Sequence, residues 1–442
     1  MPRASWVCST RPRDRVAGVS SRERPGPVGL NLLLIPASYP HPGAEWAGIF
    51  NEHSALALQR DVRHIEVLVP TPYVPRLLAS SDRWRTWTAR ERLQRGVRVH
   101  RATYPVLPKI FQGFWPTRAA ALFVRRRARI LHGRVGFDAI LSFDLARTGG
   151  LAWRLGRDLG VPACGWATGT DIRHGPGTSL GRSVREALAK LDLVFYQSGE
   201  LKTLGAALLG THVERLQPDR HVVQARGVGE PDTFPGDEVR HALRSSLGIR
   251  ENQVVVLYLG RIARGKGVFE LVEGFSAWGR ANADLVLLLV GSRPGHDDAR
   301  ELERTARVLP VPAGRIQILP GCEPQRIWDY FRAADIFAFP SFREGMPNSL
   351  LEAMLARLPA VAFSIPSIQE ITRFGKGLVE VPAHDFPEFG KALLELAADP
   401  SRRQAVAERG RTIAREHFSI RTCMRAVVSR IETLTRGSAC SV

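Results

Sequence analysis

The stretch VVVLYLGRIARGKGVFELVEGFSAW, residues 254–278, joins an apolar run to a glycine-rich turn and then to a segment with helical spacing. Six apolar residues are the length of a buried strand, and the turn opens the helix that follows. The N–H groups at such a helix start face the end of the strand, where they can bind an anion. Arg261 and Lys266 flank the turn and suit a diphosphate, although a plain surface loop would look similar. The P-loop motif is absent, because Gly267 follows Lys266 where Ser or Thr is required.

The same alternation of strand and helix runs through most of the chain. Apolar runs predict strands at 30–36, 64–69, 137–142, 161–167, 192–197, 221–225, 253–260, 284–291, 315–319, 335–340 and 359–363. Helical spacing lies between most of them, at 48–60, 146–159, 182–190, 267–280, 298–308 and 347–356. Continuous apolar strands between amphipathic helices indicate an α/β fold whose parallel sheets are covered on both faces.

Eleven strands exceed the usual size of one doubly wound sheet, so we expect two. A stretch at 205–250, rich in Gly, Pro and charge, separates two groups of strands. The prediction is two doubly wound domains, 29–220 and 221–415, that face a central cleft where ligands bind. Residues 416–442 form a C-terminal helix and tail. The amphipathic segment 418–436 either packs across both domains or stays solvated.

Composition narrows the classes of partner. The chain has 442 residues and 62 Lys and Arg against 43 Asp and Glu, a net charge of +19 that favours anionic partners. No recognised nucleic-acid-binding motif accompanies this charge, so nucleic acid is not expected. Five scattered cysteines without a C-x-x-C pair fit neither a disulfide framework nor a zinc site, and suit the cytoplasm. The longest apolar runs are too short for a transmembrane helix.

A second motif, EGMPNSLLE at 344–352, follows the strand predicted at 335–340. Glu344 belongs to the loop at the carboxyl end of that strand, and Pro347 suits a helix start. We expect Glu352 about two turns into the helix, facing the cleft. Two carboxylates placed in this way can accept hydrogen bonds from sugar hydroxyls at separate points of one extended ligand. The alternative is a pair of surface and helix-cap residues.

Together GRIARGKG and, some 80 residues later, PSFREGMPNSLLEAMLARLPAVA resemble the retaining glycosyltransferase family 4, which has the GT-B fold. The spacing of Glu344 and Glu352 matches the signature of that family. The likeness runs from about residue 30 to residue 420. In the first domain, 39–50 resembles the family's first glycine loop, and Arg226-Gly227-Val228 resembles its interdomain turn. The bacterial branch that builds cell-surface polymers is the most similar.

The resemblance implies a role for each matching residue. Arg261 and Lys266 hold the donor diphosphate and stabilise the departing nucleotide. Glu344 contacts the hydroxyls of the donor sugar, and Glu352 binds those of the ribose. The donor-binding loop that these residues belong to comprises Gly345, Met346, Pro347, Asn348 and Ser349. Gly48 lets the first domain approach donor and acceptor closely.

The first domain departs from the family at several positions. Related enzymes often read H-G-S-D where this chain has Thr168-Gly169-Thr170-Asp171. Asp171 is the residue that we expect to act in the cleft. His174 either replaces the missing histidine or is an ordinary loop residue. In the interdomain turn, Arg226 stands where Asn is frequent and Gly229 where Asp is frequent.

These features predict a metal-independent hexosyltransferase that moves sugar from a UDP- or GDP-sugar to a glycan or lipid-linked acceptor. The sequence contains no D-x-D pair, so no metal is expected, and no other cofactor. The family suggests a front-face mechanism in which the leaving phosphate accepts the acceptor's proton. The alternatives are another GT-B enzyme, such as a sugar-phosphate synthase, or a non-catalytic scaffold that binds sugar nucleotides.

Three basic segments suggest a place at a membrane surface. Residues 1–28 form a basic arm that we expect to be disordered, either a membrane- or polymer-binding arm or an upstream start. Residues 76–92 interleave Trp with Arg, and 118–134 predict a helix with apolar and basic faces. Such a helix sits on anionic membranes or packs in the core with its arginines solvated. The expected location is cytoplasmic, with peripheral binding to the inner face of the membrane.

Overall fold

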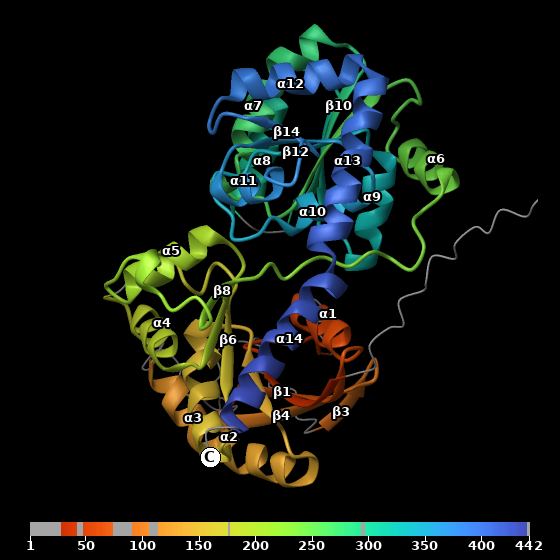
Figure 1. Cartoon of the computed structure of the whole chain (residues 1–442). Coiled ribbons are helices and arrows are strands. Elements are labelled where there is room, and N and C mark those ends of the chain that lie inside the picture. The colour runs from red at the N-terminus through yellow and green to blue at the C-terminus, as the bar shows by residue number, and fades with distance from the viewer. Residues whose placement is uncertain are drawn as a thin grey trace, which may run out of the picture.

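The computed structural model describes residues 28–41, 47–73, 91–105, 114–175, 177–292 and 297–439. It consists of two α/β domains, each built on its own sheet, one above the other in Figure 1. The predicted GT-B architecture is therefore confirmed. Within the described residues, no helix combines the length and the apolar composition that a membrane span requires.

The N-terminal sheet is parallel except at one edge, where β3 runs antiparallel to β4. Its strands, in the order β3-β4-β2-β1-β5-β6-β7-β8, are β1 (Val28–Ile35), β2 (Val62–Tyr73), β3 (Glu91–Gln94), β4 (Val97–Pro105), β5 (Ala139–Ser142), β6 (Ala163–Ala167), β7 (Leu193–Tyr196) and β8 (His221–Val223). The helices of this half of the chain are α1 (Ile49–Leu58), α2 (Phe114–Val135), α3 (Gly150–Leu159), α4 (Ser179–Lys190) and α5 (Gly199–Leu208).

The C-terminal sheet is parallel throughout. Its strands, in the order β11-β10-β9-β12-β13-β14, are β9 (Val254–Leu259), β10 (Leu285–Ser292), β11 (Ile316–Pro320), β12 (Ile336–Phe339), β13 (Ala360–Phe363) and β14 (Val379–Val381). The remaining helices are α6 (Asp237–Ser246), α7 (Val268–Ala281), α8 (Asp297–Val308), α9 (Ile327–Ala333), α10 (Asn348–Leu355), α11 (Pro366–Thr372), α12 (Phe386–Ala398), α13 (Pro400–Phe418) and α14 (Ile420–Ala439). Strand order reverses between β9 and β12, and doubly wound sheets bind ligands at that point.

The last helix belongs to the core of the first domain. Helices α2, α3 and α4 cover one face of the N-terminal sheet, while α1 and α14 cover the other. From α14, the side chains of Cys423, Met424, Val427, Val428 and Ile431 are all buried there. Figure 1 shows α13 and α14 running from the upper domain down to the lower one. The amphipathic segment predicted at 418–436 therefore packs back across both domains and is not a solvated tail.

The two segments that connect the domains are hydrogen-bonded to each other. The N–H of Val228, in the linker, donates to the carbonyl of Phe418 over 2.9 Å. The N–H of Ile420 donates in turn to the carbonyl of Val228, also over 2.9 Å. These two bonds tie the linker to the junction of α13 and α14.

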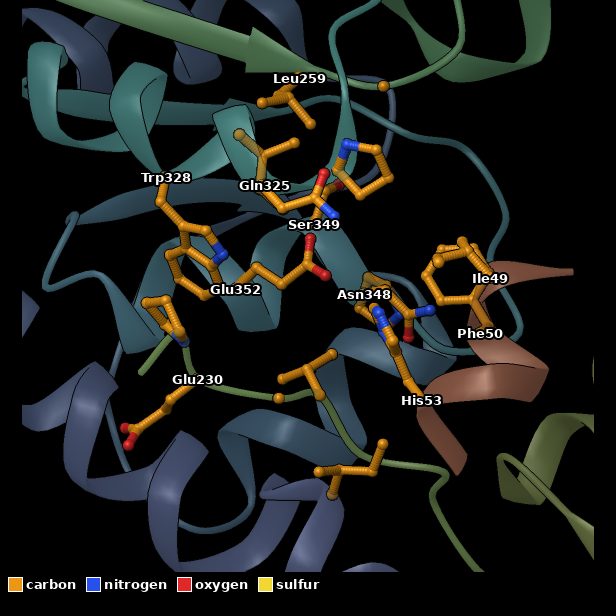
Figure 2. A pocket seen from close by; sticks show the side chains of 18 of the residues that line it. Ile49, Phe50, His53, Glu230, Leu259, Gln325, Trp328, Asn348, Ser349 and Glu352 are labelled. Atoms are coloured by element: carbon orange, nitrogen blue, oxygen red, sulfur yellow. The ribbon is translucent and has the colours of Figure 1, made fainter. Parts of the chain in front are cut away.

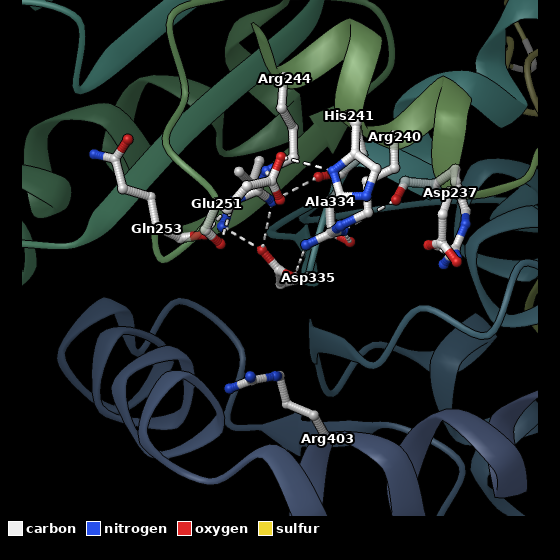
Figure 3. Close-up of polar contacts among 12 residues, drawn as sticks. Asp237, Arg240, His241, Arg244, Glu251, Gln253, Ala334, Asp335 and Arg403 are labelled. Atoms are coloured by element: carbon white, nitrogen blue, oxygen red, sulfur yellow. Dashed lines mark hydrogen bonds and ion pairs between the residues drawn. The ribbon is translucent and has the colours of Figure 1, made fainter.

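Helix α6 follows the linker and is fastened to the C-terminal domain by two arginines (Figure 3). Arg240 Nη2 lies 2.8 Å from one oxygen of Asp335, and Arg244 Nη1 lies 3.2 Å from the other. Arg244 is fully buried and donates to the carbonyls of Ala333 and Arg250. A buried charge is tolerated when it is paired and hydrogen-bonded in this way.

All eleven predicted strands are present, and the described residues contain three further strands that were missed. The longest of these, β4, was missed because its apolar residues alternate with Arg and His. His100 is buried against Glu66, and Arg101 donates to the carbonyls of Tyr39 and Pro40. These partners lie 34 to 62 residues away in sequence, so local composition gave no sign of burial.

The predicted boundary after residue 220 needs correction. β8 begins at His221 and pairs in parallel with β7, so the N-terminal sheet continues past that boundary. Helix α6 was also missed within the stretch 205–250 that was interpreted as a break. Residues 1–27 of the predicted basic arm and 74–90 of the Trp- and Arg-rich segment lie outside the described residues.

Candidate active site

A cavity of about 1660 Å³ lies between the two domains. Its C-terminal wall comes from the segments after β9, β11 and β12, and its N-terminal wall from α1 and the linker. Figure 2 shows Ile49, Phe50 and His53 on the N-terminal helix, facing Asn348 and Glu352 on the other side. The cavity therefore lies where the strand order of the C-terminal sheet reverses, as the doubly wound prediction requires.

Lys266 enters the cavity from a turn that depends on glycine. Gly267 has φ +66°, and a Cβ atom there would lie 2.0 Å from the carbonyl oxygen of Pro340. Only glycine therefore allows the β9–α7 turn to pack against the end of β12. This close approach places Lys266 Nζ 2.5 Å from Glu344 Oε1, so two residues 78 positions apart form one ion pair.

Arg261 also lines the cavity and is exposed. Within the described parts of the chain its guanidinium forms no ion pair, so its charge is available to a ligand. Arg264, in the same turn, points away and pairs with Glu301. Of the three cations in this turn, Arg261 and Lys266 therefore reach the cavity, as predicted.

Five donor-binding residues predicted after β12 line the cavity: Glu344, Met346, Pro347, Asn348 and Ser349. Gly345 does not line it, and packs against the first domain instead. Helix α10 starts at Asn348, and its apolar residues Leu350, Leu351, Met354 and Leu355 are fully buried, as expected.

Glu352 faces the cavity, but it lies little more than one turn into α10. The prediction of two turns was wrong because the loop after Glu344 extends through Pro347 before the helix begins. Burial raises the pKa of Glu352 to about 8. Its carboxylate points into the space between Trp328 and Asn348 in Figure 2.

The N-terminal wall is set by Gly48. It begins α1 with φ +74°, and a Cβ atom would lie 2.3 Å from the carbonyl oxygen of Ser38. Glycine therefore lets the first turn of α1 close against the end of β1, and Ile49 rather than Gly48 lines the cavity. His53, one turn further along α1, also lines it, and burial lowers the pKa of its imidazole. Its position four residues after Ile49 on the helix would have identified it.

Asp171 does not reach the cavity, which corrects the expectation that it acts there. The side chain is buried. One oxygen accepts the N–H groups of Thr168, Gly169 and Ile172, and the other accepts the N–H of Leu145. Burial, reinforced by the charge of Asp144, raises the pKa of Asp171 to about 6. Asp171 therefore shapes the loop after β6. Thr168 and His174 do not line the cavity either.

Arg226, the unusual residue of the interdomain turn, is buried and holds α1 in place. It donates to Ser54 Oγ over 2.8 Å and to Asn51 Oδ1 over 2.6 Å. Its guanidinium also lies over the ring of Phe143. Burial lowers the pKa of Arg226 to about 10. This residue thus fixes the helix that forms the N-terminal wall, a role that the sequence did not reveal.

Comparison with known proteins relates the C-terminal domain to a sequence family. The sequence profile of the family Glycosyl transferases group 1 matches residues 239–413. The C-terminal domain therefore carries the profile of the group 1 glycosyl transferases. All the residues that converge on the C-terminal wall, from Arg261 to Glu352, lie inside this match, and the predicted recognition as a glycosyltransferase is confirmed.

The chain is also similar to curated glycosyltransferases, one of which it matches over most of its length. It is 24% identical over 355 residues to "Putative teichuronic acid biosynthesis glycosyltransferase TuaC" of Bacillus subtilis, covering 78% of this chain and 84% of that protein. It is 31% identical over 201 residues to "D-inositol 3-phosphate glycosyltransferase" of Rhodococcus opacus, but this covers only 43% of either chain.

Solved structures share the whole fold at low identity. Sucrose-phosphate synthase from Thermosynechococcus elongatus superposes with a TM-score of 0.70 at 17% identity, covering 92% of this chain and all of that chain. HepE from Anabaena in complex with UDP superposes with a TM-score of 0.68 at 18% identity, covering 91% of this chain and all of that chain.

Among the described residues, no group of three His, Cys, Asp or Glu side chains is arranged to hold a metal ion.

Proposed function

We propose that this glycosyltransferase is a retaining, metal-independent enzyme that moves a sugar from a UDP- or GDP-sugar to a polysaccharide or lipid-linked acceptor. One observation carries the proposal. Two cations and two carboxylates, Arg261, Lys266, Glu344 and Glu352, line one cavity at the point where strand order reverses. This arrangement suits a ligand with a diphosphate at its centre and hydroxyl-bearing rings on both sides.

The charges match those that develop when a nucleotide leaves a sugar. Cleavage of the anomeric C–O bond places negative charge on the phosphate and positive charge on the ring. Arg261 and Lys266, with the amides at the start of α10, would stabilise the phosphate. Glu344 would hold the sugar hydroxyls, and Glu352 those of the ribose. In a front-face reaction the leaving phosphate oxygen takes the acceptor's proton, so the protein needs to supply no nucleophile.

The relatives support this donor class and acceptor class. HepE was crystallised with UDP and with UDP-glucose, and TuaC is named for teichuronic acid biosynthesis. A cell-surface polymer would be assembled by a cytoplasmic enzyme at the membrane, where a lipid-linked acceptor lies.

A panel of UDP-, GDP- and ADP-sugars, scored by the thermal shift of the full chain, tests the proposal. A bound donor raises the apparent melting temperature by mass action, and Glu344→Ala and Lys266→Ala should each reduce that shift. A shift from the free nucleotide alone, with no sugar transfer to any extracted acceptor, would favour the non-catalytic scaffold. No shift with any member of the panel would overturn the proposal.

Helix α2 supports binding to an anionic membrane. Leu122, Phe123 and Ile130 are 74%, 50% and 47% exposed, and Arg126 and Arg134 are exposed on the same surface. Of the four apolar residues on which the membrane prediction rested, only Leu131 is in the core. Apolar side chains flanked by arginine suit the headgroup region of such a membrane.

Flotation with vesicles of phosphatidylglycerol and phosphatidylcholine at low salt tests this surface. We expect the wild type to float and the double variant Phe123→Glu, Ile130→Glu to stay at the bottom. Val308→Glu is the matched control, because Val308 is 81% exposed on α8 of the other domain. Flotation of the double variant to the same extent as the wild type would overturn the role of α2.

A further inference from the structure

Away from the linker around Val228, the loop that carries Glu344 contacts the N-terminal domain. A Cβ atom on Gly345 would lie 3.1 Å from the carbonyl oxygen of Thr168 and 3.2 Å from Gly169 Cα. The two backbones therefore approach so closely that a side chain at Gly345 would require one of them to shift. The Asp171 carboxylate shapes the first-domain side of this contact through its bonds to Thr168 and Gly169.

Arg173 adds a polar bond at the same contact. Its Nη2 donates to the backbone carbonyl of Glu344 over 3.2 Å, across the domain interface. Within the described residues, that carbonyl accepts no other hydrogen bond. A guanidinium is a strong donor, so this bond fixes the peptide from which the Glu344 side chain projects toward Lys266.

Arg173 is itself held in place by Glu200, whose helix contacts the second domain. Its Nη2 lies 2.9 Å from Glu200 Oε1, and the two side chains are 27% and 22% exposed. Glu200 lies in the first turn of α5. Glu370, on α11 of the second domain, accepts the N–H of the neighbouring Gly199 over 2.6 Å. Both ends of this chain of contacts, Glu344 and Glu370, thus belong to the C-terminal domain.

We propose that Arg173 is a positioning residue that fixes Glu344 only when the domains are together. Domain closure and placement of the sugar-binding carboxylate then become one event, because the donor of the bond and its acceptor lie on different domains. This inference rests on the proposed function of Glu344. It predicts that Arg173 affects the sugar part of donor binding and leaves the nucleotide part unchanged, since Arg261, Lys266 and Glu352 hold the nucleotide.

Hydrogen–deuterium exchange of the full chain without ligand tests the bond directly. We expect Arg173→Ala to speed exchange of the amides in 342–346 by about fivefold, because a hydrogen bond that restrains this loop is lost. Arg185→Ala is the matched control, since Arg185 is an exposed arginine on α4 of the same domain. Equal exchange rates in both variants would overturn the proposal.

Calorimetric titration with UDP and with UDP-glucose separates positioning from a general structural role. Arg173→Ala should raise the Kd for UDP-glucose about fivefold and change the Kd for UDP less than twofold. Arg173→Lys should restore part of the loss. In the Glu344→Gln background, Arg173→Ala should add no further loss, because its effect passes through Glu344. Equal losses for both ligands, or full additivity with Glu344→Gln, would overturn the proposal.

Failure of this inference differs from failure of the proposed function. If Glu344→Gln weakens UDP-glucose binding while Arg173→Ala behaves like Arg185→Ala, only the inference is wrong. If Glu344→Gln leaves the Kd for UDP-glucose unchanged, the assigned role of Glu344 is wrong as well. The exchange measurement decides whether the interdomain bond restrains the loop in either case.

Discussion

The two domains that face the cleft use polar residues at strand ends in opposite ways. Lys266 follows β9, and its side chain enters the cavity to meet Glu344. Asp171 follows β6, and its side chain turns inward to accept four backbone N–H groups. The C-terminal domain thus presents charge to a ligand, while the N-terminal domain uses the charge of Asp171 to shape the backbone. A charged residue after a buried strand can therefore serve a ligand where the cavity reaches it, and not where backbone N–H groups occupy it.

The largest expected effect is on the C-terminal wall. Lys266→Ala should lower sugar transfer by roughly 10²–10³-fold, because a positioned cation opposite developing phosphate charge is lost. The measurement is the initial rate of transfer with the donor that the panel identifies. The melting temperature should stay close to that of the wild type, because Lys266 lies at the cavity surface.

Arg264→Ala is the control for that experiment. Arg264 lies in the same turn and carries the same charge, but it pairs with Glu301 outside the cavity. Its variant should keep nearly full activity. Equal losses of transfer rate in Lys266→Ala and Arg264→Ala would mean that the turn acts only through its net charge. The contrast between the two domains would then fail.

In the N-terminal domain, Asp171→Asn should lower the free energy of unfolding more than it lowers activity. Replacing one carboxylate oxygen with NH₂ leaves buried N–H groups without an acceptor, at a cost of roughly 2 kcal/mol. Chemical denaturation measures this loss. Activity should fall only modestly, through the loop that meets Gly345. A loss of activity as large as that of Lys266→Ala, with unchanged stability, would return Asp171 to the catalytic site.

The sequence predicts those strands and site residues whose signals are local, and it misses those that depend on distant partners. Continuous apolar strands and the motifs around Lys266 and Glu344 were found because their signals are local. Strand β4 was missed because its buried His100 and Arg101 depend on partners far away in sequence. Asp171 was misplaced because a carboxylate that binds amides and one that faces a ligand occupy the same position after a strand. Arg173 binds a carbonyl of the other domain, and Arg226 binds side chains of α1 more than 170 residues away, which no local pattern shows.

Glu352 should make the free energy of unfolding depend on pH. Its carboxyl ionises near pH 4.5 when unfolded, and burial raises its folded pKa to about 8. The unfolded chain therefore loses this proton first, so the stabilisation is full below pH 4.5 and is lost as the pH rises through 8. The slope approaches about 1.4 kcal/mol per pH unit within that window.

Glu352→Gln removes the titrating group and should flatten this decline. Denaturation of both proteins between pH 5 and 8 measures the difference, which should grow with pH in favour of the variant. Parallel stability curves for the two proteins would show that Glu352 is solvated enough to ionise normally, and that the C-terminal wall holds its carboxylates ready in the charged form.

The smallest effect is expected at Thr168, where related enzymes often carry histidine. Its N–H is bonded to Asp171, and its carbonyl oxygen lies against Gly345, so the contribution of this residue comes from its backbone. Thr168→Ala keeps those backbone groups and should change the transfer rate by less than about threefold, since only an unbonded hydroxyl is lost. A loss of a hundredfold would show that the hydroxyl acts on the substrate. The N-terminal domain would then contribute chemistry of its own, and the division between a domain that binds the donor and a domain whose polar residues shape the backbone would no longer hold.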